Sequence, residues 1–166
     1  MPRFSLPDDE LRALDRLAHV SIVYLAVVGL ASFFAGAFSL CVPVELCRLI
    51  PIALIGISGS AIAALTSSLD RYANGFERED GKSFPTGAKK GAGKFNRRFA
   101  RWLFIRPFLG AVIAPVFIWG LSHFAKNPEE FLGKKEAVAF TAFLGGLLAK
   151  SILDLIKNLF KNVFRA

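Results

Sequence analysis

The chain has 166 residues, of which 54% are hydrophobic, and 21 Lys and Arg against 13 Asp and Glu give it a net charge of +8. The hydrophobic fraction exceeds that of an ordinary soluble domain, and its long uninterrupted runs argue against a soluble core built from short amphipathic elements. The length leaves room for one membrane domain and none for a separate soluble domain.

Four stretches without Asp, Glu, Lys or Arg predict four transmembrane helices. A bilayer core about 30 Å thick needs roughly 20 apolar residues of helix. The first three stretches meet this length, and the fourth meets it only if Lys150 extends its amine to the headgroups. We therefore expect an all-α integral membrane four-helix bundle, with helices over residues 18–41, 49–69, 102–125 and 137–157. The four stretches are Leu17–Val44, Leu49–Leu69, Pro107–Ala125 and Ala137–Ala149.

The basic residues are sorted by side, which predicts the topology. Of the 21 Lys and Arg, 17 lie in the two terminal segments and in residues 70–106, and 4 lie in the other two connections. Cytoplasmic segments carry the excess of positive charge. We therefore expect a multi-pass protein of the plasma (bacterial inner) membrane, folded as two antiparallel hairpins with both termini in the cytoplasm. The positive charge needs no nucleic-acid partner, because no nucleic-acid motif accompanies it.

The chain divides into a short N-terminal segment and one membrane domain. Residues 1–16 are expected to form a cytoplasmic amphipathic segment. The acidic residues in this segment argue against a signal peptide. Residues 17–166 form the single transmembrane domain. Its cytoplasmic loop covers residues 70–101, of which 70–80 are expected to continue the second helix. The fourth helix is expected to extend into the cytoplasm over residues 157–164.

Small residues recur every fourth position in the second helix and face a similar stripe in the first. Such residues let helix backbones approach closely in lipid. The stripes are interpreted either as a subunit interface or, as we favour, as the contact between these two helices within one chain. The packing residues are Gly29, Ser32, Gly36, Gly56, Gly59, Ser60, Ala63 and Ala64.

One stripe of the fourth helix suggests a pore. Its cytoplasmic half is charged and its outer half apolar, and charges within a membrane helix usually face a bundle interior or water. In a ring of subunits the stripe would line the path, with Phe143 at a hydrophobic constriction. The alternative is an amphipathic helix lying on the inner leaflet, which we favour slightly for this stripe. The candidate pore-lining residues are Glu136, Ala139, Phe143, Gly146, Leu147, Lys150, Asp154, Lys157 and Lys161.

A basic run leads into the third helix and suggests contact with anionic lipid headgroups. The alternative is simple retention of the loop in the cytoplasm. Arg106 stands out, because it is expected below the headgroups and needs a carboxylate partner, for which Asp70 and Asp154 have a similar depth. The candidate headgroup residues are Lys94, Arg97, Arg98, Arg101 and Arg106.

Cysteine and histidine give little support to a redox or metal site. Cys41 and Cys47 are expected together on the outer side, where they form either a disulfide or two free thiols. His19 and His123 are expected at opposite faces of the membrane, so they cannot share a metal or haem. No residue set supports catalysis, and we expect no enzyme activity, no cofactor and no metal.

Two functions remain after these exclusions. The first is a small homo-oligomeric ion channel or pore, with the fourth helix lining the path. The second is a membrane anchor, scaffold or effector subunit that docks a cytosolic protein through loop 70–101, or binds anionic lipid, at the inner leaflet. Both hypotheses place the chain in the lipid bilayer.

Overall fold

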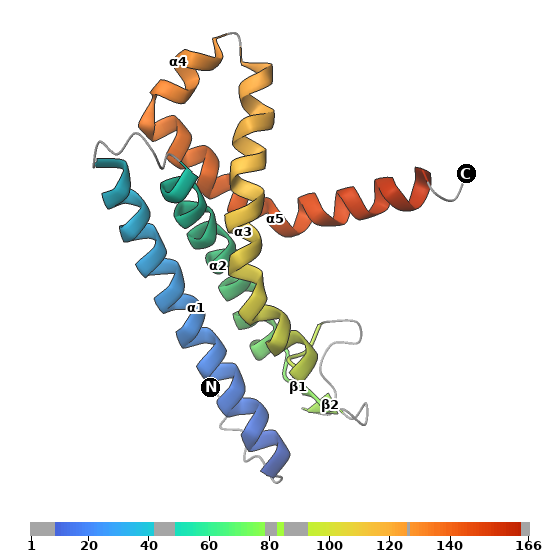
Figure 1. Ribbon diagram of the computed structural model, residues 1–166. Helices are drawn as coiled ribbons and strands as arrows, with labels where there is room; N and C mark the ends of the chain where they lie inside the picture. Colours follow the sequence, from blue (N-terminus) through green and yellow to red (C-terminus); the bar gives the residue numbers. More distant parts are fainter. Residues whose placement is uncertain (1–8, 42–48, 79–82, 85–92, 126, 164–166) are drawn as a thin grey trace.

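The structure, a computed structural model, describes residues 9–41, 49–78, 83–84, 93–125 and 127–163. Within these residues four long helices, one short helix and two short strands are arranged as Figure 1 shows. The four long helices are long and apolar enough to cross a membrane, which confirms this part of the prediction. The elements are α1 (Asp9–Cys41), α2 (Leu49–Ala73), β1 (Phe76–Glu77), β2 (Ser83–Phe84), α3 (Arg97–Phe124), α4 (Pro128–Gly133) and α5 (Lys135–Val163).

Helix α1 is longer than the predicted first span. It begins at Asp9 and runs without a break into the apolar run, so the predicted boundary at residue 17 lies inside one helix. Neither Gly nor Pro occurs between Asp9 and Val28 to interrupt it. Asp9 and Glu10 occupy the first turn, where acidic side chains interact favourably with the helix dipole.

The predicted continuation of the second helix through residue 80 is wrong. Helix α2 ends at Ala73, and Gly75 follows with a φ of 96°, a left-handed conformation that commonly ends a helix. The chain then forms β1, which pairs antiparallel with β2 so that Phe76 lies opposite Phe84. An Asn-Gly pair after the apolar run is the local signal for this change of direction.

Helix α2 lies at the centre of the bundle, where it packs against α1, α3 and α5. Gly56 lies so close to Gly110 of α3 and Gly146 of α5 that a side chain at any of the three would overlap backbone atoms. On the other side, a side chain at Gly36 of α1 would overlap Ile55. The close approach of backbones explains why small residues follow α2 at intervals of three and four.

A hydrophobic core joins the first half of α1 to α2, β1 and the start of α3. Phe95 is fully buried in it, with its ring edge-on to the rings of Phe76 and Phe99. The segment predicted as a loop, residues 70–101, is therefore partly packed against the bundle. We call its described residues the cap. The buried members of this core are Leu11, Leu14, Ala18, Leu25, Ala64, Phe76, Phe95, Ala100 and Leu103.

Polar contacts also fasten the cap to α1. Arg78, next to β1, forms an ion pair with Glu10 at 2.6 Å. The Tyr72 hydroxyl donates a hydrogen bond to Asp15 at 2.9 Å. The described parts of residues 70–101 are thus held to the beginning of α1 by apolar and polar contacts.

A second core lies toward the opposite end of the bundle, between α2, α3 and the first half of α5. Phe131 of the short helix α4 packs against it. Its buried residues are Ile52, Ile55, Ala114, Ile118, Val138 and Ala142.

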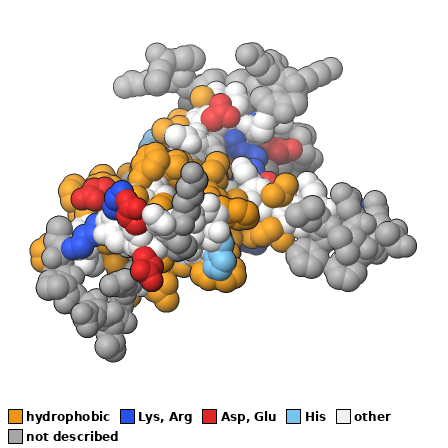
Figure 2. All heavy atoms as spheres, turned by 90° about the horizontal axis from the view of Figure 1, so that it is seen from above, with side chains coloured by type: hydrophobic (Ala, Val, Ile, Leu, Met, Phe, Trp, Pro, Cys, Tyr) orange, Lys and Arg blue, Asp and Glu red, His pale blue; other side chains and the backbone are white. Residues whose placement is uncertain are grey.

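The outer surface of the bundle is rich in exposed apolar side chains. Phe38 is 73% exposed, Trp119 67% and Phe124 87%. Figure 2 shows apolar side chains over much of the visible surface, with the charged ones gathered in small groups. A soluble monomer rarely exposes so much contiguous apolar surface, whereas a bilayer would cover it.

Candidate functional site

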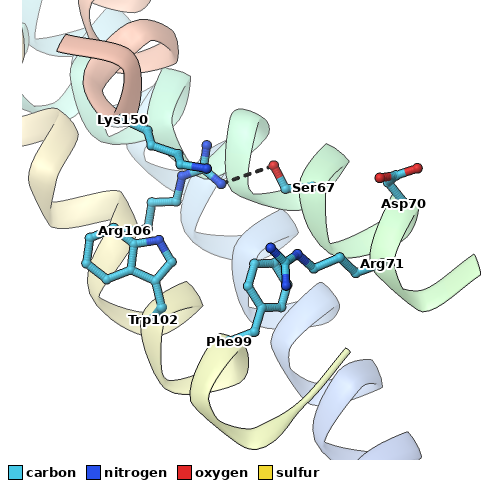
Figure 3. Close-up of a pocket in the computed structure, with 7 residues that line it drawn as sticks. All are labelled: Ser67, Asp70, Arg71, Phe99, Trp102, Arg106 and Lys150. Atoms are coloured by element: carbon cyan, nitrogen blue, oxygen red, sulfur yellow. Dashed lines mark hydrogen bonds between the residues drawn. The ribbon is translucent and has the colours of Figure 1, made fainter. Parts of the chain in front are cut away.

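A cationic pocket lies between α2, α3 and α5 (Figure 3). Its volume is about 420 Å³. Three of its seven lining side chains are basic, one is acidic and two are aromatic. The lining residues are Ser67, Asp70 and Arg71 from α2, Phe99, Trp102 and Arg106 from α3, and Lys150 from α5.

Arg106 is the most deeply placed charge of the pocket. It is only 6% exposed, and its Nη1 donates a hydrogen bond to the Ser67 hydroxyl at 3.1 Å. Ser67 in turn donates to the carbonyl of Ala63 at 2.8 Å, so its one hydroxyl proton is already used. Ser67 therefore fixes the guanidinium but carries no charge to balance it.

The predicted carboxylate partner of Arg106 is not found. Within the described part of the chain, no ion pair joins Arg106 to Asp70 or Asp154. Asp70 lines the pocket but is exposed, and Asp154 lies beyond the pocket on an exposed stretch of α5. Asp70 and Arg106 thus line the same pocket without forming an ion pair.

Lys150 and Arg71 supply the remaining positive charge. Figure 3 shows the Lys150 side chain running toward the guanidinium of Arg106. Arg71 is held differently, with its guanidinium carbon 4.0 Å from the centre of the Phe99 ring and its Nη1 donating to the Lys94 carbonyl at 3.3 Å. Arg71 is thus anchored at the wall, and Arg106 and Lys150 add two further positive charges to the lining of the pocket.

The backbone around Pro107 is supported by hydroxyl groups from neighbouring helices. Ser60 donates to the Arg106 carbonyl at 2.8 Å, and Tyr24 donates to the Phe104 carbonyl at 3.3 Å. Pro107 has no N–H to donate within α3, so the carbonyl of Leu103, four residues earlier, lacks its helical donor. These bonds fix the turn of α3 that presents Arg106 to the pocket.

The structure divides the predicted pore stripe of α5 into two parts. Ala139 and Phe143 pack against the second core, and Gly146 lies against Gly56 within the same chain. Leu147 is half-buried. The charged members, by contrast, are exposed, and these are Glu136, Lys150, Asp154, Lys157 and Lys161. Pore lining stays a prediction.

The predicted packing and headgroup residues lie at different places. Gly29 meets Ala61 of α2, and Gly59 lies against the backbone of Phe143. Among the predicted packing residues, Ala64 is buried, and Ser32 and Ala63 are half-buried.

Among the predicted headgroup residues, Arg106 alone lines the pocket. Lys94 is half-buried, and the exposed ones are Arg97, Arg98 and Arg101.

Two other expectations concern cysteine and metal. The alternative of a Cys41–Cys47 disulfide or two free thiols depends on Cys47, which lies outside the described residues. His19 has its Nδ1 2.9 Å from the Asp15 carbonyl oxygen, and His123 has its own 2.9 Å from that of Trp119. Within the described segments no three His, Cys, Asp or Glu side chains gather into a group that could hold a metal ion.

The sequence does not predict that these side chains line one pocket. No sequence pattern connects Arg71, Phe99 and Trp102 with Arg106, and Lys150 belongs to the predicted pore stripe. A usable signal existed in Arg106 itself, because an arginine beside an apolar run needs a partner. Which side chains surround it depends on how α2, α3 and α5 are rotated about their axes, and no local pattern gives that rotation.

Comparison of the chain with protein-family models, with curated proteins and with solved structures found no match. The functional argument therefore rests on the geometry of this chain.

Proposed function

We propose that the chain is a multi-pass anchor of the inner leaflet, with two antiparallel hairpins and both termini in the cytoplasm. In this proposal the first half of α5 crosses the membrane with α1, α2 and α3. Its second half, from residue 151 onward, lies along the cytoplasmic surface of the plasma (bacterial inner) membrane. The described part of residues 70–101 presents the surface on which a cytosolic protein would dock.

The course of α5 carries this proposal. Its first half packs against α2 and α3, and its second half projects sideways from the bundle (Figure 1). Leu155 is 61% exposed and Ile156 39% exposed on that projecting half. An apolar helix face needs a covering surface, and a membrane surface covers it without a further protein.

The charge pattern of the projecting half fits a leaflet surface. At 100° per residue, Ile152, Leu155 and Ile156 fall on one face, and Asp154 and Lys157 fall on the opposite face. Lysines on the polar face suit anionic headgroups, each contributing about 1 kcal/mol near the surface. In this proposal the apolar side chains would lie in the acyl region and the charges in water.

A fluorescent label tests the anchor directly. With both native cysteines replaced by serine, single cysteines at Leu155 and Lys157 would carry an environment-sensitive dye in vesicles containing phosphatidylglycerol. We expect the dye at 155 to be blue-shifted and protected from iodide, and the dye at 157 to be quenched. Equal quenching at both positions would remove the basis for the proposal.

The sidedness is testable with three exposed positions. Cysteines at Arg12 and Lys157 should react with a membrane-impermeant maleimide only from the cytoplasmic side. A cysteine at Glu129, in the connection between α3 and α5, should react only from the opposite side. Reaction of all three from one side would contradict the two-hairpin topology.

The exposed charges of α5 favour a homo-oligomeric channel as the second candidate. Lys150, Asp154, Lys157 and Lys161 remain available for a path between subunits. The anchor ranks above it because Phe143 and Gly146 are already used for packing within the chain. Ion flux in liposomes that falls in Lys150→Ala would support the channel, and no flux from the unmodified protein would exclude it.

A further inference from the structure

We propose that the pocket between α2, α3 and α5 is a binding site for a negatively charged phosphate group, with Arg106 and Lys150 as its two charged ligands. This inference goes beyond the anchor function and does not depend on where the second half of α5 lies. Lys150 is the first charge after the packed half of α5, and Arg106 belongs to α3.

The first argument is the unbalanced charge of Arg106. Its side chain is buried, its hydrogen-bonding partner is a neutral hydroxyl, and within the described residues no carboxylate pairs with it. A guanidinium removed from water without a counter-charge is costly. Lys150 adds a second cation to the lining of the same pocket, and its side chain runs toward Arg106 in Figure 3. An anion between Arg106 and Lys150 would offset both charges at once.

The second argument is the chemistry of the two ligands. A guanidinium presents a planar fork of donors that matches two oxygens of a phosphate, and a lysine amine adds a compact charge for a third oxygen. Ser67 cannot contribute a donor, since its hydroxyl already donates to Ala63 and accepts from Arg106. Ser67 is therefore a positioning residue that orients the fork toward the cavity.

The third argument is the character of the walls. Arg71 is held by Phe99 and the Lys94 carbonyl, so it adds positive potential without needing to move. The cavity of about 420 Å³ exceeds what a single carboxylate would fill, and Trp102 offers an apolar wall beside the charges. Basic pockets between membrane helices on the cytoplasmic side are typical sites for phosphate headgroups.

The same chemistry is supplied by an anionic lipid headgroup or by free phosphate, and Trp102 can report both. Trp119 is the only other tryptophan in the sequence and is 67% exposed, so Trp119→Phe leaves Trp102 as the single reporter. The full chain with this substitution would be placed in nanodiscs of phosphatidylcholine alone, or with a minor fraction of phosphatidylglycerol. In a separate arm, inorganic phosphate would be added to the phosphatidylcholine nanodiscs, with chloride at equal ionic strength as its control.

We expect phosphatidylglycerol, inorganic phosphate or both to change the fluorescence of Trp102. A response to the lipid alone identifies a headgroup site, and a response to inorganic phosphate identifies a site open to soluble phosphate compounds. No response in either arm would overturn the proposal. Because the reporter lies in α3, this result is independent of the labelling of residues 155 and 157.

Charge-removing substitutions separate the pocket from general surface attraction. Arg106→Gln and Lys150→Gln should each weaken binding by about 10-fold, the loss expected for one charge-assisted hydrogen bond. Lys157→Gln removes the same charge from the same helix outside the pocket and should change nothing. Lys150 is exposed, so Lys150→Gln remains informative if Arg106→Gln fails to fold. Equal binding by the Lys150 and Lys157 variants would overturn the assignment.

Discussion

The backbone of Gly59 in α2 lies directly against the backbone of Phe143 in α5. A methyl group at Gly59 would overlap the Phe143 carbonyl oxygen and approach the amide nitrogen of Leu147. Glycine is therefore required at this point by the distance between two helices, and its own backbone conformation is ordinary. The contact fixes how α5 leaves the bundle and hence where Lys150 lies.

Replacing Gly59 by leucine should loosen or unfold the bundle. Overpacking of a closed interface costs about 1–3 kcal/mol, and here rigid backbone atoms must move. Thermal unfolding in detergent would show a lower midpoint. Gly120→Leu is the matched control, because an added Cβ there meets no heavy atom within 4 Å. Equal loss in both variants would show that the contact is not made.

Replacing Phe95 by alanine tests the packed cap. Phe95 is fully buried between Phe76 and Phe99, so truncation should cost about 3–5 kcal/mol. Phe124→Ala removes the same side chain from a site that is 87% exposed and should cost far less. A flexible loop at 70–101 would instead leave the unfolding midpoint of Phe95→Ala unchanged.

The fate of residues 70–101 shows what the sequence could and could not predict. Long charge-free runs identify membrane helices because bilayer thickness sets their length. Phe76 and Phe95 lie far apart in a stretch rich in Gly, Lys and Pro, and their contact requires the ends of α2 and α3 to be brought together. Local patterns carry no such information, so the sequence predicts a loop where the structure has a packed segment.

Arg106 illustrates the same limit at the site. Its position beside an apolar run predicts an arginine below the headgroups, and in the structure its side chain is buried between helices. The predicted ion pair with Asp70 or Asp154 does not form, because a similar depth along the helices does not by itself bring two side chains together. Ser67 faces Arg106 instead, and this depends on the rotation of α2 about its axis.

Gly75 should resist substitution for a conformational reason. Its φ of 96° lies in the left-handed region, where a side chain costs about 1–2 kcal/mol. Gly75→Ala should therefore lower the unfolding midpoint. Gly133→Ala should not, since Gly133 has no positive φ and open space around its Cα. An unchanged midpoint for Gly75→Ala would contradict the turn that ends α2.

The pKa of Glu130 should respond to its neighbour. Hydrogen bonds from Lys134 at 2.7 Å and from Asn127 lower the pKa of this exposed carboxyl below its ordinary value. Because this pKa is lower in the folded protein, the stabilisation by the contact is fully present above the ordinary carboxyl pKa of about 4.3. It is lost as the pH falls through the pKa of the folded state. Lys134→Ala should raise the pKa, as NMR titration of the Glu130 side chain would measure. No upward shift would show that the bond to Lys134 does not form in solution.

The depth of α5 in the membrane most directly tests the proposal that its second half lies along the membrane surface. Single spin labels placed along residues 137–161, in vesicles, report depth through their collisions with oxygen and with a water-soluble nickel complex. We predict that depth changes steadily across the bilayer from 137 to 149. From 151 onward it should stay constant on average, with labels at 152, 155 and 156 deeper than labels at 154 and 157. A steady change of about 1.5 Å per residue continuing through 161 would mean an upright helix and would contradict the anchor.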